Sequence, residues 1–286
     1  MTADLVLRGG RVVDGTGSPA RDADVAVTDG VISDIGPNLT GRDEVDASGL
    51  VVAPGFIDIH THYDAQALWE PTFSPSCYHG VTTVIGGFCG FSIAPCRPEH
   101  RALLGRTLQH VEDMDLATLE AGIPWDFETF PQYLDSVERR GVALNFGCYV
   151  GHTAVRIEAM GEAGYEREEP TADEIAAMQR IIDEAMAAGA MGFASSSSAT
   201  HSGDGGRPIP SRLASLPELE ALLAPLRDRD RGVVALLPGE RIKHADLYGL
   251  QRRIGRPLTW TALLTVTGFP YHEGIIADND AARAEG

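Results

Sequence analysis

The chain has 286 residues, of which 43% are hydrophobic and 22% are charged. That apolar content can bury a large core, which excludes a disordered or fibrous protein. Acidic residues outnumber Lys and Arg by 41 to 23, which gives a formal net charge of −18. A surface with this charge repels nucleic-acid backbones and anionic lipids, so we expect no nucleic acid and no membrane among the partners.

The N-terminus and the four cysteines bear on the cellular compartment. The sequence begins MTADLVLRGG, without the basic and apolar segments of a secretory leader. No apolar run approaches the ~18 residues that a membrane helix needs. We therefore expect a cytoplasmic protein whose cysteines are buried thiols or metal ligands and form no disulfide.

Residues 1–52 carry short apolar alternations that are broken by Gly and Asp. Asp29 and Gly30 stand between two apolar runs, which is a strong signal for a two-residue hairpin. We predict a small antiparallel sheet over 1–52 and a separate domain over 53–286.

From Ala53 onward the pattern changes to apolar strand, loop and amphipathic helix. The predicted strands cover 55–62, 81–89, 142–151, 190–196, 232–238 and 258–266. Such alternation predicts an α/β fold with a parallel sheet, either open and doubly wound or most of an eight-stranded barrel. The first strand is not followed by GxGxxG, which disfavours the dinucleotide-binding version.

Three helices are predicted from capping signals. Thr171 and Glu174 form a capping-box pattern at the start of the clearest helix, and Gly189 suits its end. Two further helices are expected over 215–226 and 245–254.

The most informative motif is GFIDIHTHYD, which places His60 and His62 at the end of the first barrel strand. Residues i and i+2 of a strand point to the same side, and parallel α/β folds place their sites at this end. Two imidazoles there suit one divalent metal, zinc above all. Two ordinary polar histidines at a strand end would be the alternative, and the context favours ligands.

The second barrel strand ends in IGGFCGFS. The glycines around Cys89 let the backbone approach a metal closely, and a thiolate binds zinc at about 2.3 Å. A buried free cysteine is the alternative. The neighbouring HxH strand favours the ligand.

These segments, with HGVTTVIGGFCGFSIAP and YVGHTAVR, resemble the N-acyl-D-amino-acid deacylases (D-aminoacylases) of the amidohydrolase superfamily, as a divergent branch. The resemblance runs through the chain and is most specific over 46–95 and 147–156. It implies a TIM (β/α)₈ barrel, of which about six units are present, and an N-terminal portion of a small β-sandwich. It also implies a zinc hydrolase that deacylates N-acyl-D-amino acids with metal-activated water.

The resemblance assigns roles by position. His60 and His62 match the first-strand ligands and Cys89 matches the metal-binding cysteine, which implies one or two zinc ions. His152 matches the histidine of a GH…R loop, where it would polarise the scissile carbonyl or stabilise the oxyanion. Arg156 matches the arginine of that loop, where it would bind a substrate carboxylate.

The sequence also departs from the family. The histidines expected after the fifth and sixth strands are absent from VVALLPGE and LTWTALLTV, and Phe88 stands where the family has an asparagine. The only lysine, Lys243, lies beyond the fifth strand, so a bridging ligand would have to be Cys89. The catalytic aspartate that follows the eighth strand in the family has no counterpart before Gly286.

We therefore expect His201 to supply a substitute ligand or catalytic group. We also expect an incomplete chain, which a complementing C-terminal polypeptide or a homo-oligomer would complete. Two other functions stay open at this point. One is cyclic-amide opening of the hydantoinase or dihydroorotase kind, and the other is a non-catalytic half of a split or truncated enzyme.

Overall fold

The computed structural model describes residues 2–263 and 271–285. The chain divides into two compact units, Met1–Phe56 and Ile57–Gly286. Within the described ranges, every helix is too short or too polar to span a lipid bilayer.

The smaller unit is a mixed β-sheet. Its strands are β1 (Ala3–Val12), β2 (Arg21–Thr28), β3 (Val31–Gly36), β4 (Gly41–Asp46) and β5 (Val51–Val52). The order is β3-β2-β1-β4, and β5 also pairs with β1. The pairs β1–β2 and β2–β3 are antiparallel, but β4 and β5 run parallel to β1.

The prediction of a purely antiparallel sheet is therefore wrong for β4 and β5. The predicted hairpin is present, since Val31 pairs with Thr28 across a turn in which Asp29 and Gly30 both have positive φ. After β3 the chain passes to the opposite edge of β1, and it enters β4 in the same direction as β1.

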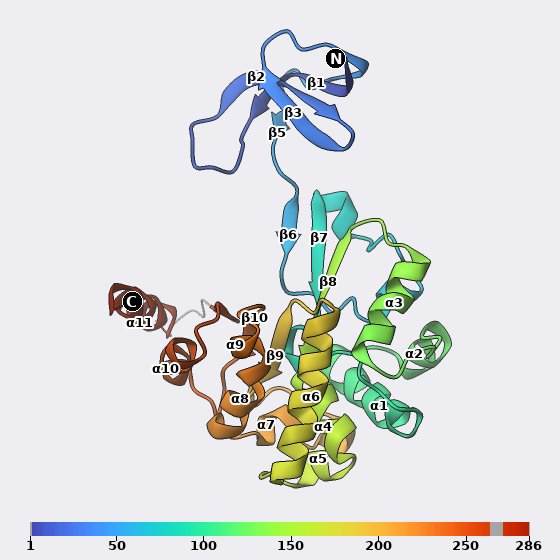
Figure 1. Ribbon diagram of the computed structural model, residues 1–286, viewed down its shortest axis with the longest axis vertical. Helices are drawn as coiled ribbons and strands as arrows, with labels where there is room; N and C mark the ends of the chain where they lie inside the picture. The colour runs from blue at the N-terminus through green and yellow to red at the C-terminus, as the bar shows by residue number, and fades with distance from the viewer. Residues whose placement is uncertain (1, 264–270, 286) are drawn as a thin grey trace. The chain divides into compact units, whose positions relative to one another are not determined.

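The larger unit contains a six-stranded sheet. Its strands are β6 (Phe56–Asp58), β7 (Val81–Gly86), β8 (Asn145–Gly151), β9 (Gly192–Ser196), β10 (Val233–Leu237) and β11 (Leu258–Trp260). Their order follows the chain without a reversal, and each neighbouring pair from β7 to β11 is parallel (Figure 1). A doubly wound sheet would reverse its order at a switch point, so this is the winding of a (β/α) barrel.

All six strands lie within the predicted strand segments. The last is shorter than predicted, because β11 ends at Trp260, and residues 264–266 of that prediction lie outside the described residues.

The helices are α1 (Arg101–Glu112), α2 (Leu116–Gly122), α3 (Phe130–Arg140), α4 (His152–Met160), α5 (Ala163–Glu166), α6 (Ala172–Ala188), α7 (Pro210–Leu213), α8 (Leu216–Leu222), α9 (Ala224–Asp228), α10 (His244–Ile254) and α11 (Tyr271–Glu285). Short 3₁₀ turns cover Gln66–Leu68, Ser76–His79, Phe88–Gly90, Pro98–His100 and Asp204–Gly206.

The capping signals are confirmed for α6. The side chain of Thr171 accepts a hydrogen bond from the backbone of Glu174, and Gly189 ends the helix with a left-handed conformation. The helix predicted over 215–226 is instead two helices, α8 and α9. Pro225 has no N–H with which to continue α8, which explains the break.

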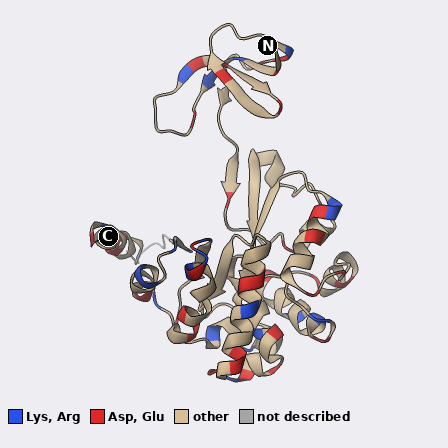
Figure 2. Cartoon of the chain, viewed as in Figure 1, with Lys and Arg blue, Asp and Glu red and all other residues tan. Residues whose placement is uncertain are grey.

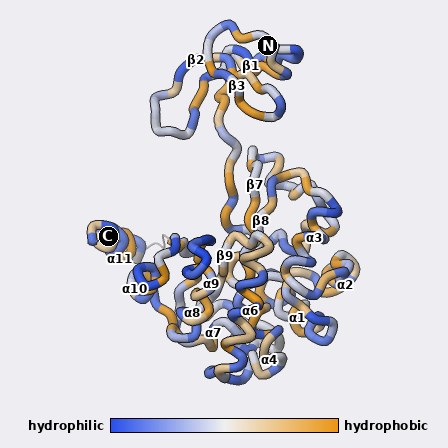
Figure 3. Tube along the Cα trace, viewed as in Figure 1, coloured by the Kyte–Doolittle hydropathy of each residue, from blue (hydrophilic) through white to orange (hydrophobic). Residues whose placement is uncertain are grey.

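The core of the larger unit lies between its strands and helices. Val84, Val150 and Phe193 on the strands are fully buried, as are Met178 and Ile182 on α6. Apolar residues recur along β7 and β8 (Figure 3), and neither strand carries a charged residue (Figure 2). A rigid apolar sheet therefore carries the segments that follow its strands.

Candidate metal centre

The segment after β6 brings His60 and His62 together. Thr61 lies between them, and both its backbone N–H and its hydroxyl donate to the carbonyl of Ile85 in β7, at 3.1 and 2.9 Å. Because Thr61 is held toward β7, the side chains before and after it project together on the other side. The two imidazole centroids are 5.4 Å apart.

A tight turn after β7 carries Cys89. Gly87, Cys89 and Gly90 all have positive φ, at 76°, 58° and 81°. A Cβ atom on Gly87 would lie 2.3 Å from the carbonyl oxygen of Tyr149, so only glycine allows the turn to pack this closely on β8. The turn places Cys89 Sγ 3.3 Å from Nε2 of His60.

His60, His62 and Cys89 form one compact group. One ligand atom from each residue lies within 4.8 Å of the others, and no second group of this kind occurs among the described residues. Two imidazole nitrogens and one sulfur are a donor set that suits zinc. The geometry therefore fits the predicted metal site, and metal binding itself stays a prediction.

Burial sets the protonation states of this group. It lowers the pKa of both histidines, and that of His62 falls to about 4 with a further contribution from the charges of His60 and His201. Burial also raises the pKa of Cys89 to about 12, assisted by the negative charge of Glu112. At neutral pH the metal-free group therefore consists of neutral imidazoles and a neutral thiol.

That neutral state distinguishes the site from a cysteine nucleophile. An activated Cys–His pair is a thiolate beside an imidazolium, which requires the opposite pKa shifts. A bound divalent cation would instead compensate the cost of a buried thiolate and displace the proton of Cys89. The arrangement favours a ligand over a nucleophile.

Aromatic rings complete the walls of the group. Phe88 stacks on the imidazole of His60 with centroids 3.9 Å apart and an interplanar angle of 24°. This stacking limits the orientations open to the His60 ring. Phe91 contacts both His62 and His201, with centroids 6.4 and 5.1 Å away.

His201 lies beside the group but is not part of it. Its Nδ1 is 2.8 Å from the hydroxyl of Ser196, at the end of β9. Burial lowers the pKa of His201 to about 4, with contributions from the charges of Arg212 and His60. The side chain is therefore a neutral group close to the three predicted ligands.

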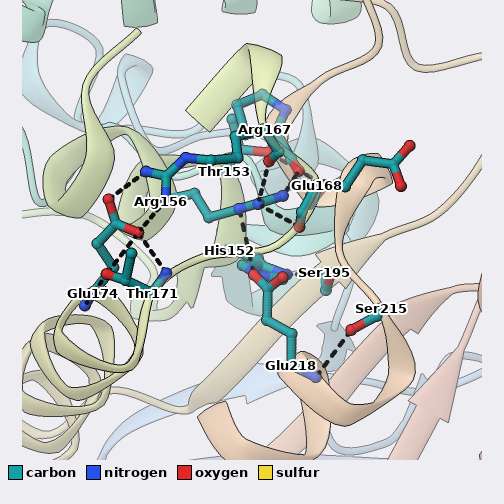
Figure 4. Close-up of polar contacts among 12 residues, drawn as sticks. His152, Thr153, Arg156, Arg167, Glu168, Thr171, Glu174, Ser195, Ser215 and Glu218 are labelled. Atoms are coloured by element: carbon teal, nitrogen blue, oxygen red, sulfur yellow. Dashed lines mark hydrogen bonds and ion pairs between the residues drawn. The ribbon is translucent and has the colours of Figure 1, made fainter. Parts of the chain in front are cut away.

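His152 lies in the interior and has partners at both ring nitrogens. The side chain has no exposed surface, its Nδ1 is 2.8 Å from Ser195 Oγ, and its Nε2 is 3.1 Å from Glu218 Oε1 (Figure 4). Both ring nitrogens thus have protein partners, and a role for His152 at the scissile carbonyl or the oxyanion stays a prediction.

Arg156 is fully buried as well. Its guanidinium donates to the carbonyl oxygens of Pro210, Arg167 and Glu168 at 2.6, 2.8 and 3.1 Å. Its Nε lies 3.3 Å from Glu218 Oε1, the oxygen that also faces His152 (Figure 4). These contacts join several segments of the chain, and the binding of a substrate carboxylate by Arg156 stays a prediction.

Two acidic residues near the site were not predicted. Asp64 is buried and accepts hydrogen bonds from the Gly87 N–H at 2.9 Å and from the Cys148 thiol at 3.2 Å. These bonds stabilise the turn that carries Cys89. Glu112, the last residue of α1, places Oε1 3.5 Å from Nδ1 of His62. Asp64 belongs to the GFIDIHTHYD motif, whereas nothing in the sequence around Glu112 signals a site.

Comparison with known proteins decides the family. The amidohydrolase family pattern matches residues 43–225. The chain belongs to the amidohydrolase family. It is 40% identical over 193 residues to the D-aminoacylase of Alcaligenes xylosoxydans xylosoxydans, a match that covers 66% of this chain and 37% of the relative.

Two solved amidohydrolase structures align with almost the whole chain. A D-aminoacylase, 32% identical, superposes with a TM-score of 0.79 over 99% of this chain and 56% of its own. The N-acyl-D-glutamate deacylase from Bordetella bronchiseptica, solved with zinc and a phosphonate inhibitor, is 29% identical with a TM-score of 0.75 and covers 100% and 57%. The chain thus spans little more than half the length of these relatives, and its fold is the predicted amidohydrolase barrel type.

Proposed function

We propose that this amidohydrolase acts on linear amide bonds and releases the acyl group from N-acyl-D-amino acids, with zinc held by His60, His62 and Cys89. The observation that carries the proposal is the group of two imidazoles and a thiol within 4.8 Å of one another, just beyond β6 and β7. The similarity to a D-aminoacylase and to an N-acyl-D-glutamate deacylase supports the substrate class.

Zinc, when bound, supplies Lewis acidity and lowers the pKa of its bound water toward about 7. The residues of the chain do the rest. His60 and His62 offer neutral nitrogens at pH 7 because burial keeps their pKa low. Cys89 contributes a negative charge once it has lost its proton. His201 is also neutral at pH 7 because burial lowers its pKa, and we assign it a contact with the substrate.

The proposal includes a reducing compartment such as the cytoplasm. Cys89 can bind zinc only as a thiolate, and all four cysteines are free. It also includes a complementing polypeptide or a second copy of the chain. Among the described strands, β11 has a partner on one side only, and a parallel edge strand is normally covered.

The test is zinc binding followed by turnover. The protein is stripped with a chelator, reloaded with Zn²⁺, and assayed against N-acetyl-D-amino acids, their L-isomers and cyclic ureides. We expect a single zinc-dependent activity, which is the release of acetate from the D-isomers. Turnover of the ureides alone, or activity that is independent of metal, would contradict the proposal.

Cys89→Ala separates the metal centre from the rest of the protein. We expect it to lose most of the bound zinc, because one of three donors in the group is gone. Cys77→Ala, which changes a half-buried cysteine outside the group, is the matched control and should keep its zinc. Equal zinc content in wild type and Cys89→Ala would remove Cys89 from the ligand set.

A further inference from the structure

We infer that Glu112 is a positioning residue for His62: its carboxylate holds the Nδ1 proton of the imidazole and so turns Nε2 toward the metal. The inference rests on the proposed metal centre and adds a residue that the sequence did not indicate. It concerns the orientation and tautomer of one ligand, and not the substrate.

The starting observation is an unsatisfied atom. Nδ1 of His62 is buried and has no hydrogen-bond partner. The cavity beside the ring, whose walls include Phe91, Leu108 and Met114, has no room for a water molecule that could serve as the partner. Glu112 Oε1, at 3.5 Å from Nδ1, is the acceptor that faces this atom. A small closing movement of the carboxylate would complete the bond.

The placement of Glu112 is suited to this task. It is the final residue of α1, which is followed by Asp113 in a left-handed conformation. Leu108 lies one turn earlier on the same face of the helix and forms part of the cavity wall, so one rigid helix supplies both the apolar contact and the carboxylate. The Glu112 side chain is only 17% exposed, which limits competition from solvent.

The chemistry of a metal-bound imidazole requires such a partner. When one ring nitrogen binds a metal, the other carries a proton, and a carboxylate on that proton fixes the tautomer and makes the ligating nitrogen more basic.

The experiment compares Glu112→Leu and Glu112→Gln with Glu120→Leu, which removes an exposed carboxylate on the neighbouring helix α2. Zn²⁺ affinity is measured in the full chain by competition with a chromophoric chelator. The visible absorption spectrum of the Co²⁺-loaded protein then reports ligand geometry. We expect Glu112→Leu to bind zinc about 10- to 100-fold more weakly and to change the cobalt spectrum. Glu112→Gln, whose amide oxygen still accepts a hydrogen bond, should have a zinc affinity nearer to that of wild type. Glu120→Leu should have the zinc affinity and cobalt spectrum of wild type.

A second measurement needs no metal. Long-range ¹H–¹⁵N correlation spectra of the metal-free protein should show the proton of His62 on Nδ1 in wild type and a shift of tautomer in Glu112→Leu. Unchanged zinc affinity and an unchanged tautomer in Glu112→Leu would overturn the inference and leave the proposed function intact. Failure of the wild-type protein to bind zinc would instead count against the proposed function.

Discussion

Replacing Arg156 by Met distinguishes the role that the structure gives this side chain from the role that the sequence suggested. Met keeps much of the length of the side chain but removes the charge. Glu218, which is 4% exposed, would then keep a carboxylate in the interior with only the neutral His152 beside it. The three backbone carbonyls that Arg156 now satisfies would also lose their donor.

Breaking a buried ion pair from one side costs about 3–5 kcal/mol, which corresponds to a fall of about 6–20 °C in Tm for a unit of this size. Thermal unfolding followed by circular dichroism measures the shift. Arg139→Met is the matched control, because its side chain is 58% exposed and pairs with Asp126 at the surface. The control should change the free energy of unfolding by no more than about 0.5–1 kcal/mol.

A double variant tests whether the unpaired charge of Glu218 causes the loss of stability. Adding Glu218→Gln to Arg156→Met removes the stranded charge, so the double variant should regain part of the lost stability. The opposite pattern would refute the structural role. If Arg156→Met unfolds like wild type but raises the KM for an acylated amino acid, the guanidinium contacts the substrate, as the sequence alone suggested.

Two further predictions concern the protonation of His62 and the turn that carries Cys89. The free energy of unfolding should fall as the pH drops from about 6.5 to 4. The pKa of His62 is about 4 in the folded chain, so in this range the imidazole binds a proton in the unfolded chain but stays neutral in the folded one. This histidine alone accounts for about 3 kcal/mol, measurable by urea unfolding at several pH values, and a flat profile would contradict it. Gly87→Ala should destabilise the protein by about 2 kcal/mol or more and weaken zinc binding, since its Cβ would meet the Tyr149 carbonyl at 2.3 Å in a left-handed conformation. Gly274→Ala is the control: a Cβ atom at this position of α11 would meet open space, so the change should be neutral or stabilising. Equal Tm values for the two variants would refute the packing argument.

The sequence predicted those features that depend on local pattern. The strand-end positions of His60 and Cys89 followed from apolar runs that end in polar or glycine-rich segments. The hairpin at Asp29 followed from its turn residues, and the start of α6 from the Thr171 capping box. Each is determined by a few neighbouring residues, which is why a single sequence could reveal it.

The features that depend on distant residues were not predicted. The parallel pairing of β4 with β1 depends on a chain crossing that no local signal marks. Glu112 reaches His62 only because α1 ends against the site, and α1 itself was not predicted. His152 and Arg156 share a motif whose residues can face either a substrate or the interior. The partners that decide this, Ser195 and Glu218, lie on β9 and α8.

The buried motif nevertheless packs against the turn that carries Cys89. Gly151, which precedes His152, packs so closely on the Cys89 turn that a Cβ atom there would lie 2.6 Å from the carbonyl oxygen of Gly90. A Cβ atom on Gly90 would in turn lie 3.1 Å from the Cα of Ser195, whose hydroxyl is hydrogen-bonded to His152. The residues that His152 bonds or adjoins therefore pack against the turn that carries Cys89. We therefore expect substitutions in the His152 network to lower stability first, and to weaken any metal binding at Cys89 through the turn that carries it.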